Sequence, residues 1–208
     1  MSRAETMELA VAERGDLADY LATLTRGQWE EPTLCAGWRV RDVVAHVISY
    51  DDLSWPGVLK RAVRAGFRPG AINEGLVAES RSRSTGELLD RLRANLRPTG
   101  PITVNGGMIP LVDATIHHQD IRRPLGQPRE IPPERLRVVL DLAMKAPPVG
   151  AKKRAAGLRL VATDLDWSRG DGPEVRGPAE ALLMTLAGRS AAFTELDGEG
   201  RSVLAGRL

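Results

Sequence analysis

Apolar residues recur at three- and four-residue spacing along most of the first 145 residues, which is the pattern of amphipathic helices. A weaker run of this kind, over residues 58–67, predicts a short basic helix. Five helices with short connections between them are typical of a helical bundle. The clearest runs predict these five over about residues 5–24, 38–50, 85–96, 110–123 and 136–144.

Residues that start and stop helices divide this region. Ser84 and Glu87 have the spacing of a capping box, so a helix is expected to begin after Ser84. Pro110 suits the first turn of the helix that follows residue 108. The triplet Arg68-Pro69-Gly70 indicates a turn, and residues 66–85 have no clear assignment.

The character of the chain changes after residue 145. Residues 146–150 and the basic residues that follow are typical of an exposed linker. Residues 158–162 predict a strand, residues 181–186 predict a helix, and residues 193–208 a last short helical piece. We therefore expect a mainly α protein, with a helical bundle over residues 1–148 and a small α+β domain over residues 155–208.

Composition excludes several classes of protein. The 208 residues are 42% apolar, while 29 basic and 27 acidic side chains leave a net charge of only +2. This balance and the 4% aromatic content argue against binding to nucleic acid or to a membrane surface. The one cysteine, Cys35, excludes an intramolecular disulfide, and its setting suggests a small buried apolar group rather than a nucleophile. Without a signal-like or membrane-spanning run, a soluble cytoplasmic protein is expected.

The candidate chemistry lies in residues 113–120. In a helix, Asp113, His117 and Asp120 share one stripe, because they stand at positions i, i+4 and i+7. Burying a carboxylate and an imidazole is costly unless both have a partner, and a divalent metal could be that shared partner. His46 in a separate apolar helix would complete two histidines and one carboxylate, a set that leaves coordination positions open. Alternatively, His117 is a packed core histidine and Asp113 a cap.

Two neighbouring polar residues have less direct roles. His118 lies about 100° further round the helix, so we expect it to be exposed or to support a ligand from behind. Asp120 is placed to accept a ring N–H from a ligand histidine and so to fix its tautomer. A salt bridge from Asp120 to Arg122 or Arg123 is the alternative. No serine-hydrolase, P-loop or dinucleotide-binding motif is present.

Three stretches together resemble one family. Trp29 and residues 32–46 (PTLCAGWRVRDVVAH) resemble the N-terminal signature of the mycothiol-dependent maleylpyruvate isomerase family, whose members are DinB-like metal-binding four-helix bundles. Residues 113–126 (DATIHHQDIRRPLG) resemble its second metal motif. Residues 177–189 resemble part of its small C-terminal domain, so the resemblance extends over almost the whole chain.

The resemblance implies specific site residues. His46, Asp113 and His117 would be the ligands of a divalent metal, with zinc as the expected ion. Asp113 departs from the family, which commonly has glutamate there, so a shorter side chain must reach the metal. Arg189 is a candidate for gripping a carboxylate of the substrate or of the thiol, although it could equally be a solvated arginine at a helix end.

The implied activity uses a low-molecular-weight thiol, mycothiol, as cosubstrate. A metal of this kind holds a thiol as the nucleophilic thiolate. In an isomerase, the thiolate adds to a cis double bond, the bond rotates, and elimination gives the trans isomer. In an S-transferase, the thiolate attacks a small electrophile and stays attached. The alternatives are a non-catalytic metal-containing binding or stress-response protein and a metal-dependent hydrolase. The expected partners are the thiol and a small-molecule substrate, and a homodimer is left open.

Overall fold

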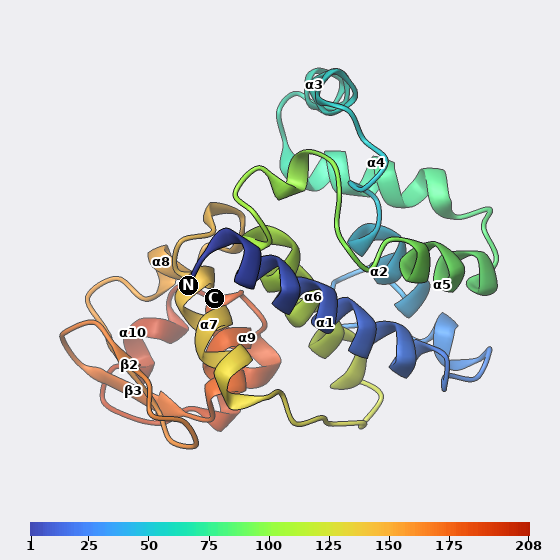
Figure 1. Ribbon diagram of the computed structural model, residues 1–208. Helices are drawn as coiled ribbons and strands as arrows, with labels where there is room; N and C mark the ends of the chain where they lie inside the picture. Colours follow the sequence, from blue (N-terminus) through green and yellow to red (C-terminus); the bar gives the residue numbers. More distant parts are fainter. The chain divides into compact units, whose positions relative to one another are not determined.

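The computed structural model describes all residues, 1–208, and divides into two compact units, Met1–Pro128 and Arg129–Leu208 (Figure 1). The boundary thus lies earlier than the one expected between residues 148 and 155. The reason is helix α7 (Pro133–Ala143), which packs against α9 (Ala179–Leu186) and so belongs to the second unit. None of the helices combines the length with the apolar character that a membrane span requires.

Four helices of the first unit form a closed ring of contacts. Helix α1 packs on α6 and α5, and α2 packs on the same two helices from the other side (Figure 1). This arrangement confirms the predicted four-helix bundle. The α-helices of the unit are α1 (Arg3–Leu21), α2 (Val40–Val47), α3 (Trp55–Arg64), α4 (Pro69–Ser80), α5 (Thr85–Ala94) and α6 (Met108–Arg122), with 3-10 turns η1 (Gln28–Glu30) and η2 (Pro101–Thr103).

The bundle core is built from the apolar positions that the periodicity picked out. The capping box is also present, because the hydroxyl of Ser84 accepts from the N–H of Glu87 and the Glu87 carboxylate accepts from the N–H of Ser84. Helix α5 therefore begins where the sequence predicts. Fully or almost fully buried core side chains include Leu17, Leu21, Val40, Val43, Val44, Leu88, Leu92, Ala114 and Ile121.

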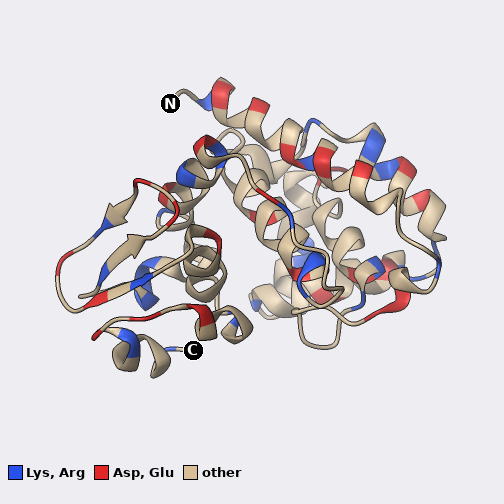
Figure 2. Ribbon diagram, turned by 90° about the horizontal axis from the view of Figure 1, so that it is seen from below, with Lys and Arg blue, Asp and Glu red and all other residues tan.

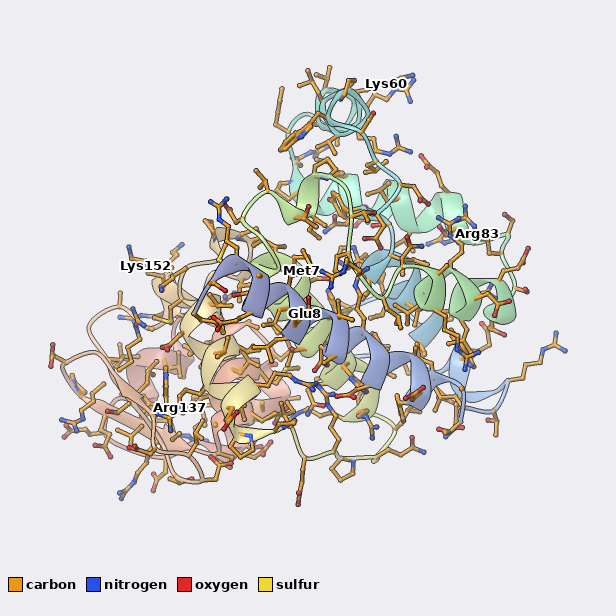
Figure 3. The ribbon with its side chains drawn as sticks, in the orientation of Figure 1. Met7, Glu8, Lys60, Arg83, Arg137 and Lys152 are labelled. Atoms are coloured by element: carbon orange, nitrogen blue, oxygen red, sulfur yellow. The ribbon has the colours of Figure 1, made fainter.

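The segment without a clear sequence assignment is helical. The predicted short basic helix is α3, and it is followed by α4, which the sequence analysis missed. Pro69 was read as part of a turn, but it occupies the first position of α4, where its missing N–H is no loss. Helix α3 has no buried residue, and Lys60 projects from it away from the bundle (Figure 3). Helix α4 packs on α2 and so reaches the bundle.

The second unit combines short helices with a small sheet. Strand β1 pairs antiparallel with β2 and parallel with β3, so the order is β2-β1-β3. The expected exposed linker is wrong, because residues 147–154 form a 3-10 turn and a short helix in which Ala151 is buried. The elements are α7, η3 (Pro147–Val149), α8 (Ala151–Arg154), β1 (Arg159–Ala162), β2 (Ser168–Arg169), β3 (Glu174–Gly177), α9, η4 (Ser190–Glu195) and α10 (Arg201–Ala205).

Acidic and basic residues are interspersed along both units (Figure 2). Neither unit shows a long run of one sign in this view, in keeping with the net charge of +2.

Candidate metal centre

Three donor atoms from two helices of the bundle meet around one point. His46 lies in the last turn of α2, and Asp113 and His117 lie on successive turns of α6. Oδ1 of Asp113 is 3.5 Å from Nε2 of His46 and 3.5 Å from Nε2 of His117, and the three donors lie within 4.8 Å of one another. Metal–nitrogen and metal–oxygen bonds of about 2.0–2.1 Å in a tetrahedron place neighbouring donors about 3.3 Å apart. The residues therefore fit a divalent metal.

His117 is oriented through its second ring nitrogen. Nδ1 of His117 lies 2.8 Å from Oδ2 of Asp120, whose side chain is fully buried. In the neutral ring, an N–H on Nδ1 that donates to this carboxylate leaves the lone pair on Nε2, which faces Asp113 and His46. The structure thus places Asp120 against Nδ1 of His117, in the position that its spacing predicts.

Cys35 joins this arrangement from the loop before α2. Its thiol donates to Oδ2 of Asp120 at 3.1 Å and lies 3.6 Å from Nδ1 of His117. The backbone N–H of Leu34 donates to the carbonyl of Asp120, which holds the loop against α6. The sequence reading of Cys35 as a small apolar group missed this contact, because a loop residue carries no periodicity that indicates its neighbours.

Cys35, His117 and Asp120 also offer a ligand-like group. The 2.8 Å between His117 and Asp120 is the length of a hydrogen bond and is shorter than the spacing of about 3.3 Å expected between metal donors. The His46, Asp113 and His117 set matches that spacing better. Cys35 and Asp120 therefore serve as hydrogen-bonding neighbours of the centre.

The electrostatics of the site favour the charged forms of Asp113 and His117. Burial alone would raise the pKa of Asp113, but His117 and then His46 oppose it and hold the pKa well below its usual range. Burial would likewise lower the pKa of His117, but the charge of Asp113 and hydrogen bonds to Asp113, Asp120 and Cys35 raise it well above its usual value. A cation at this point would take over the role of the imidazolium proton.

His46 is held by a different kind of neighbour. The residue is 7% exposed, and its ring packs between the rings of Trp38, 5.1 Å away, and Tyr50, 6.4 Å away. It also meets the ring of His117 edge-on, at 4.9 Å and 85°. Tyr50 in turn donates its hydroxyl to Oδ1 of Asn73 on α4 at 2.7 Å. The sequence analysis missed Trp38 and Asn73 as neighbours of the site, whereas Tyr50 stands one helical turn after His46, and that spacing indicates its contact.

The expectation for His118 is wrong. Its side chain is fully buried and its Nδ1 lies 3.1 Å from Oε1 of Glu13 on α1. Its Nε2 accepts from the guanidinium of Arg122 at 2.9 Å, and that guanidinium lies 3.7 Å from the centre of the Tyr20 ring. Helix α1 covers this side of α6, so a polar network replaces the solvent that His118 was expected to face.

Arg189 lies in the second unit, just beyond α9. Its guanidinium is half-buried and donates to the carbonyl of Ala187 at 2.7 Å. The structure brings together His46, Asp113 and His117, all of which belong to the first unit. Arg189 belongs to the other unit, and its role at this site is not tested. Its contact with a carboxylate stays a prediction.

A helical bundle with two histidines and one carboxylate around a single point defines a candidate metal-binding bundle. Residues 10–122 match the family described as the mycothiol maleylpyruvate isomerase N-terminal domain. This match spans more than half of the chain, so the chain belongs to that family and the predicted resemblance is confirmed.

Two solved structures share the fold. A crystal structure of the mycothiol-dependent maleylpyruvate isomerase is 18% identical, with a TM-score of 0.61, and the match covers 96% of this chain and 93% of that one. A histidine-to-alanine mutant of the isomerase is 17% identical, with the same TM-score and coverage. The coverage extends the shared fold through both units. A comparison with curated proteins found no match.

Proposed function

We propose that the protein is a metal-dependent enzyme that uses mycothiol, as an isomerase or an S-transferase, on a small electrophile. The observation that carries the proposal is the spacing of the three donors, with Asp113 Oδ1 at 3.5 Å from both histidine nitrogens. The family description and the names of the two similar structures support the thiol and the isomerase reaction. Zinc is the proposed ion, and the cytoplasm the proposed location.

Each residue of the centre has a distinct part in this proposal. A bound divalent ion would hold the cosubstrate thiol as the thiolate. His46 and His117 present Nε2, and Asp113 presents Oδ1, to one point. Asp120 keeps the proton of His117 on Nδ1. The Asp113 side chain is 24% exposed while both histidines are almost buried, so the open side for thiol and substrate lies by Asp113.

Arg189 is the proposed contact for a carboxylate of the substrate or the thiol. A guanidinium binds a carboxylate with two parallel hydrogen bonds, which a lysine cannot reproduce. If Arg189 has this role, Arg189→Lys should raise KM or weaken thiol binding and leave the metal content unchanged.

Metal content is the first test. Wild-type protein should contain about one divalent ion per chain, and Asp113→Asn, His46→Ala and His117→Ala should each lose it. Glu13→Gln is the matched control. Glu13 on α1 pairs with His118, which lies on α6 like Asp113 and His117 but takes no part in the centre. A wild type that binds no stoichiometric metal would overturn the proposal.

Thiol binding and turnover are tested on the metal-loaded protein. Mycothiol should raise the melting temperature, since a ligand of the folded state stabilises it. Isomerisation of maleylpyruvate that requires catalytic mycothiol supports the isomerase, and stoichiometric thiol consumption on an electrophile supports the transferase. No shift at millimolar mycothiol would overturn the thiol-dependent function and favour a hydrolase or a non-catalytic metal protein.

A further inference from the structure

The two ligand histidines are held in different ways. Nδ1 of His117 has a buried carboxylate, Asp120, at hydrogen-bond distance. Nδ1 of His46 is also buried, but no hydrogen-bonding partner from the protein lies within reach of it. A metal-binding histidine is normally oriented by a hydrogen bond to its second nitrogen. The orientation of His46 must therefore come from another source.

Aromatic packing is that source. The ring of Trp38 is tilted by 51° to the His46 ring, and the ring of Tyr50 meets it edge-on at 87°. Both centroid distances, 5.1 Å and 6.4 Å, fall within the range of favourable aromatic pairs. The His46 ring also meets the edge of His117. Rings on several sides restrict rotation of His46 without any hydrogen bond to Nδ1.

Tyr50 is held at its hydroxyl by a hydrogen bond and is closely approached at its backbone carbonyl. Its hydroxyl donates to Oδ1 of Asn73 on α4 at 2.7 Å. If residue 100 had a side chain, its Cβ would lie only 2.5 Å from the carbonyl oxygen of Tyr50. Gly100 also has a φ of +72°. The loop before η2 can therefore approach the Tyr50 backbone this closely only with glycine at position 100. The hydrogen bond to Asn73 therefore orients the Tyr50 ring that packs against His46.

We propose that Tyr50 is a positioning residue for His46 and that Asn73 sets the orientation of Tyr50. The proposal rests on the proposed metal site for its consequence, since His46 is useful there only if Nε2 faces Asp113. It gives the α3–α4 segment a function, because α4 then acts on the metal centre through one hydrogen bond. Tyr50 acts through His46, so it is not assigned a contact with the substrate.

The metal-free protein offers a direct test. The chain has three histidines, so a carbon–proton NMR spectrum of the imidazole ε1 positions should contain three signals, assigned with His46→Ala and His117→Ala. Tyr50→Leu removes the ring and should move or broaden the His46 signal. The His118 signal should stay in place, because His118 is bound to Glu13 and Arg122. A His46 signal that does not change in folded Tyr50→Leu protein would overturn the proposal.

The role of Asn73 is tested with a pair of tyrosine variants. Tyr50→Phe and Asn73→Leu remove the same hydrogen bond, so both should change the His46 signal, and the double variant should do no more than either. Tyr20→Phe is the control, because Tyr20 also donates to an amide oxygen, that of Gln127, at 2.7 Å. An equal change in Tyr20→Phe would mean general loosening of the bundle and would overturn the assignment.

Cobalt(II) binding then separates this inference from the proposed function. Tyr50→Leu should weaken the affinity by about 10-fold, the lower end of what loss of an orienting neighbour costs, and should alter the visible spectrum of the bound ion. Tyr20→Phe should change neither. If cobalt binds the wild type and Tyr50→Leu equally, with equal spectra, the inference fails and the function stands. If the NMR results are as expected but no variant or wild type binds cobalt, the function fails and the positioning of His46 stands.

Discussion

Asp120 and His117 are joined by a hydrogen bond of 2.8 Å at Nδ1 of the histidine, while Nε2 of the same ring faces Asp113. Asp120 lies one turn beyond His117 on α6, and its carboxylate also accepts a hydrogen bond from the thiol of Cys35. A second histidine–carboxylate pair, His118 and Glu13, lies on the other side of the same helix and takes no part in the centre. Adjacent histidines on α6 thus serve two different purposes, one in the site and one in the packing of α1.

These two pairs allow a matched comparison. Asp120→Asn removes the negative charge behind His117, so zinc affinity should fall by about 10-fold, as for other neighbours that orient a ligand. Glu13→Gln changes the equivalent carboxylate of the other pair and should lower the melting temperature without changing zinc affinity. The measurement is competition with a chelating dye. Equal affinities for Asp120→Asn and wild type would show that His117 needs no carboxylate behind it.

The short side chain of Asp113 is already matched to its partners. Its Oδ1 stands 3.5 Å from both histidine nitrogens, close to the spacing of about 3.3 Å for donors around one ion. The extra methylene of Asp113→Glu would push the carboxylate past this point, so zinc affinity should fall several-fold rather than rise. Asp113→Asn keeps the shape but removes the charge and should lose the metal. Tighter zinc binding by Asp113→Glu would contradict this prediction. It would mean that the donor spacing of 3.5 Å in this structure is not kept when the ion binds.

A Cys35 variant distinguishes between the two groups of residues that could hold the ion, because Cys35 belongs to only one of them. Cys35→Ser keeps a donor to Asp120, so zinc should stay bound at one ion per chain, whereas His46→Ala should abolish binding. The thiol lies at hydrogen-bond distance from Asp120, and this is the contact that serine preserves. The test is zinc content after dialysis. Loss of zinc in Cys35→Ser with retention in His46→Ala would place the ion at the Cys35, His117 and Asp120 group instead.

The sequence predicted the grouping of His46, Asp113 and His117 better than the surroundings of these residues. Asp113 and His117 are on one helix, and spacing alone brings them together, while the family signature supplies His46. His118 could not be placed in this way, because its environment depends on which face of α6 is covered by α1. Glu13 lies 105 positions away along the chain, and no local pattern in the sequence indicates that contact.

Helix α4 and the division into units show a second limit. Proline after arginine and before glycine suggested a turn, yet Pro69 begins a helix that carries Asn73 to the site. Helix α7 has the same amphipathic pattern as the bundle helices, and its periodicity cannot tell which unit it joins. The indole N–H of Trp167 donates to Asp141 on α7 at 3.1 Å, a long-range contact that helps bind this helix to the second unit.

The stability of the bundle should depend on a buried ion pair between α1 and the chain just after α2. Both side chains are 1% exposed, and Nη1 of Arg14 lies 2.8 Å from Oδ2 of Asp51. The guanidinium also donates to the carbonyls of Val47 and Asn95. Removing one partner leaves a buried charge, so Arg14→Met should lower the free energy of unfolding by about 3–5 kcal/mol. Chemical denaturation measures this loss.

An exposed pair supplies the control for this prediction. Arg97 and Glu8 lie 2.6 Å apart on the surface, with side chains 58% and 64% exposed. Figure 3 labels Glu8 on α1, the helix that also carries Arg14. Exposed pairs contribute about 0–1 kcal/mol, so Arg97→Met should have little effect. Similar losses for Arg97→Met and Arg14→Met would show that burial does not decide the strength of these pairs.

The effect of Arg14→Met should depend on pH. Burial raises the pKa of Asp51 above its usual value of 3.8, although Arg14 and the N–H of Thr99 oppose the rise. Without Arg14 the pKa of the folded state rises further, so the folded protein holds a proton that the unfolded chain releases above about pH 4. Stability of Arg14→Met relative to wild type should therefore fall as pH increases from 4 to 7. The double variant with Asp51→Asn cannot ionise at this position, and an equally steep pH dependence there would assign the effect to another group.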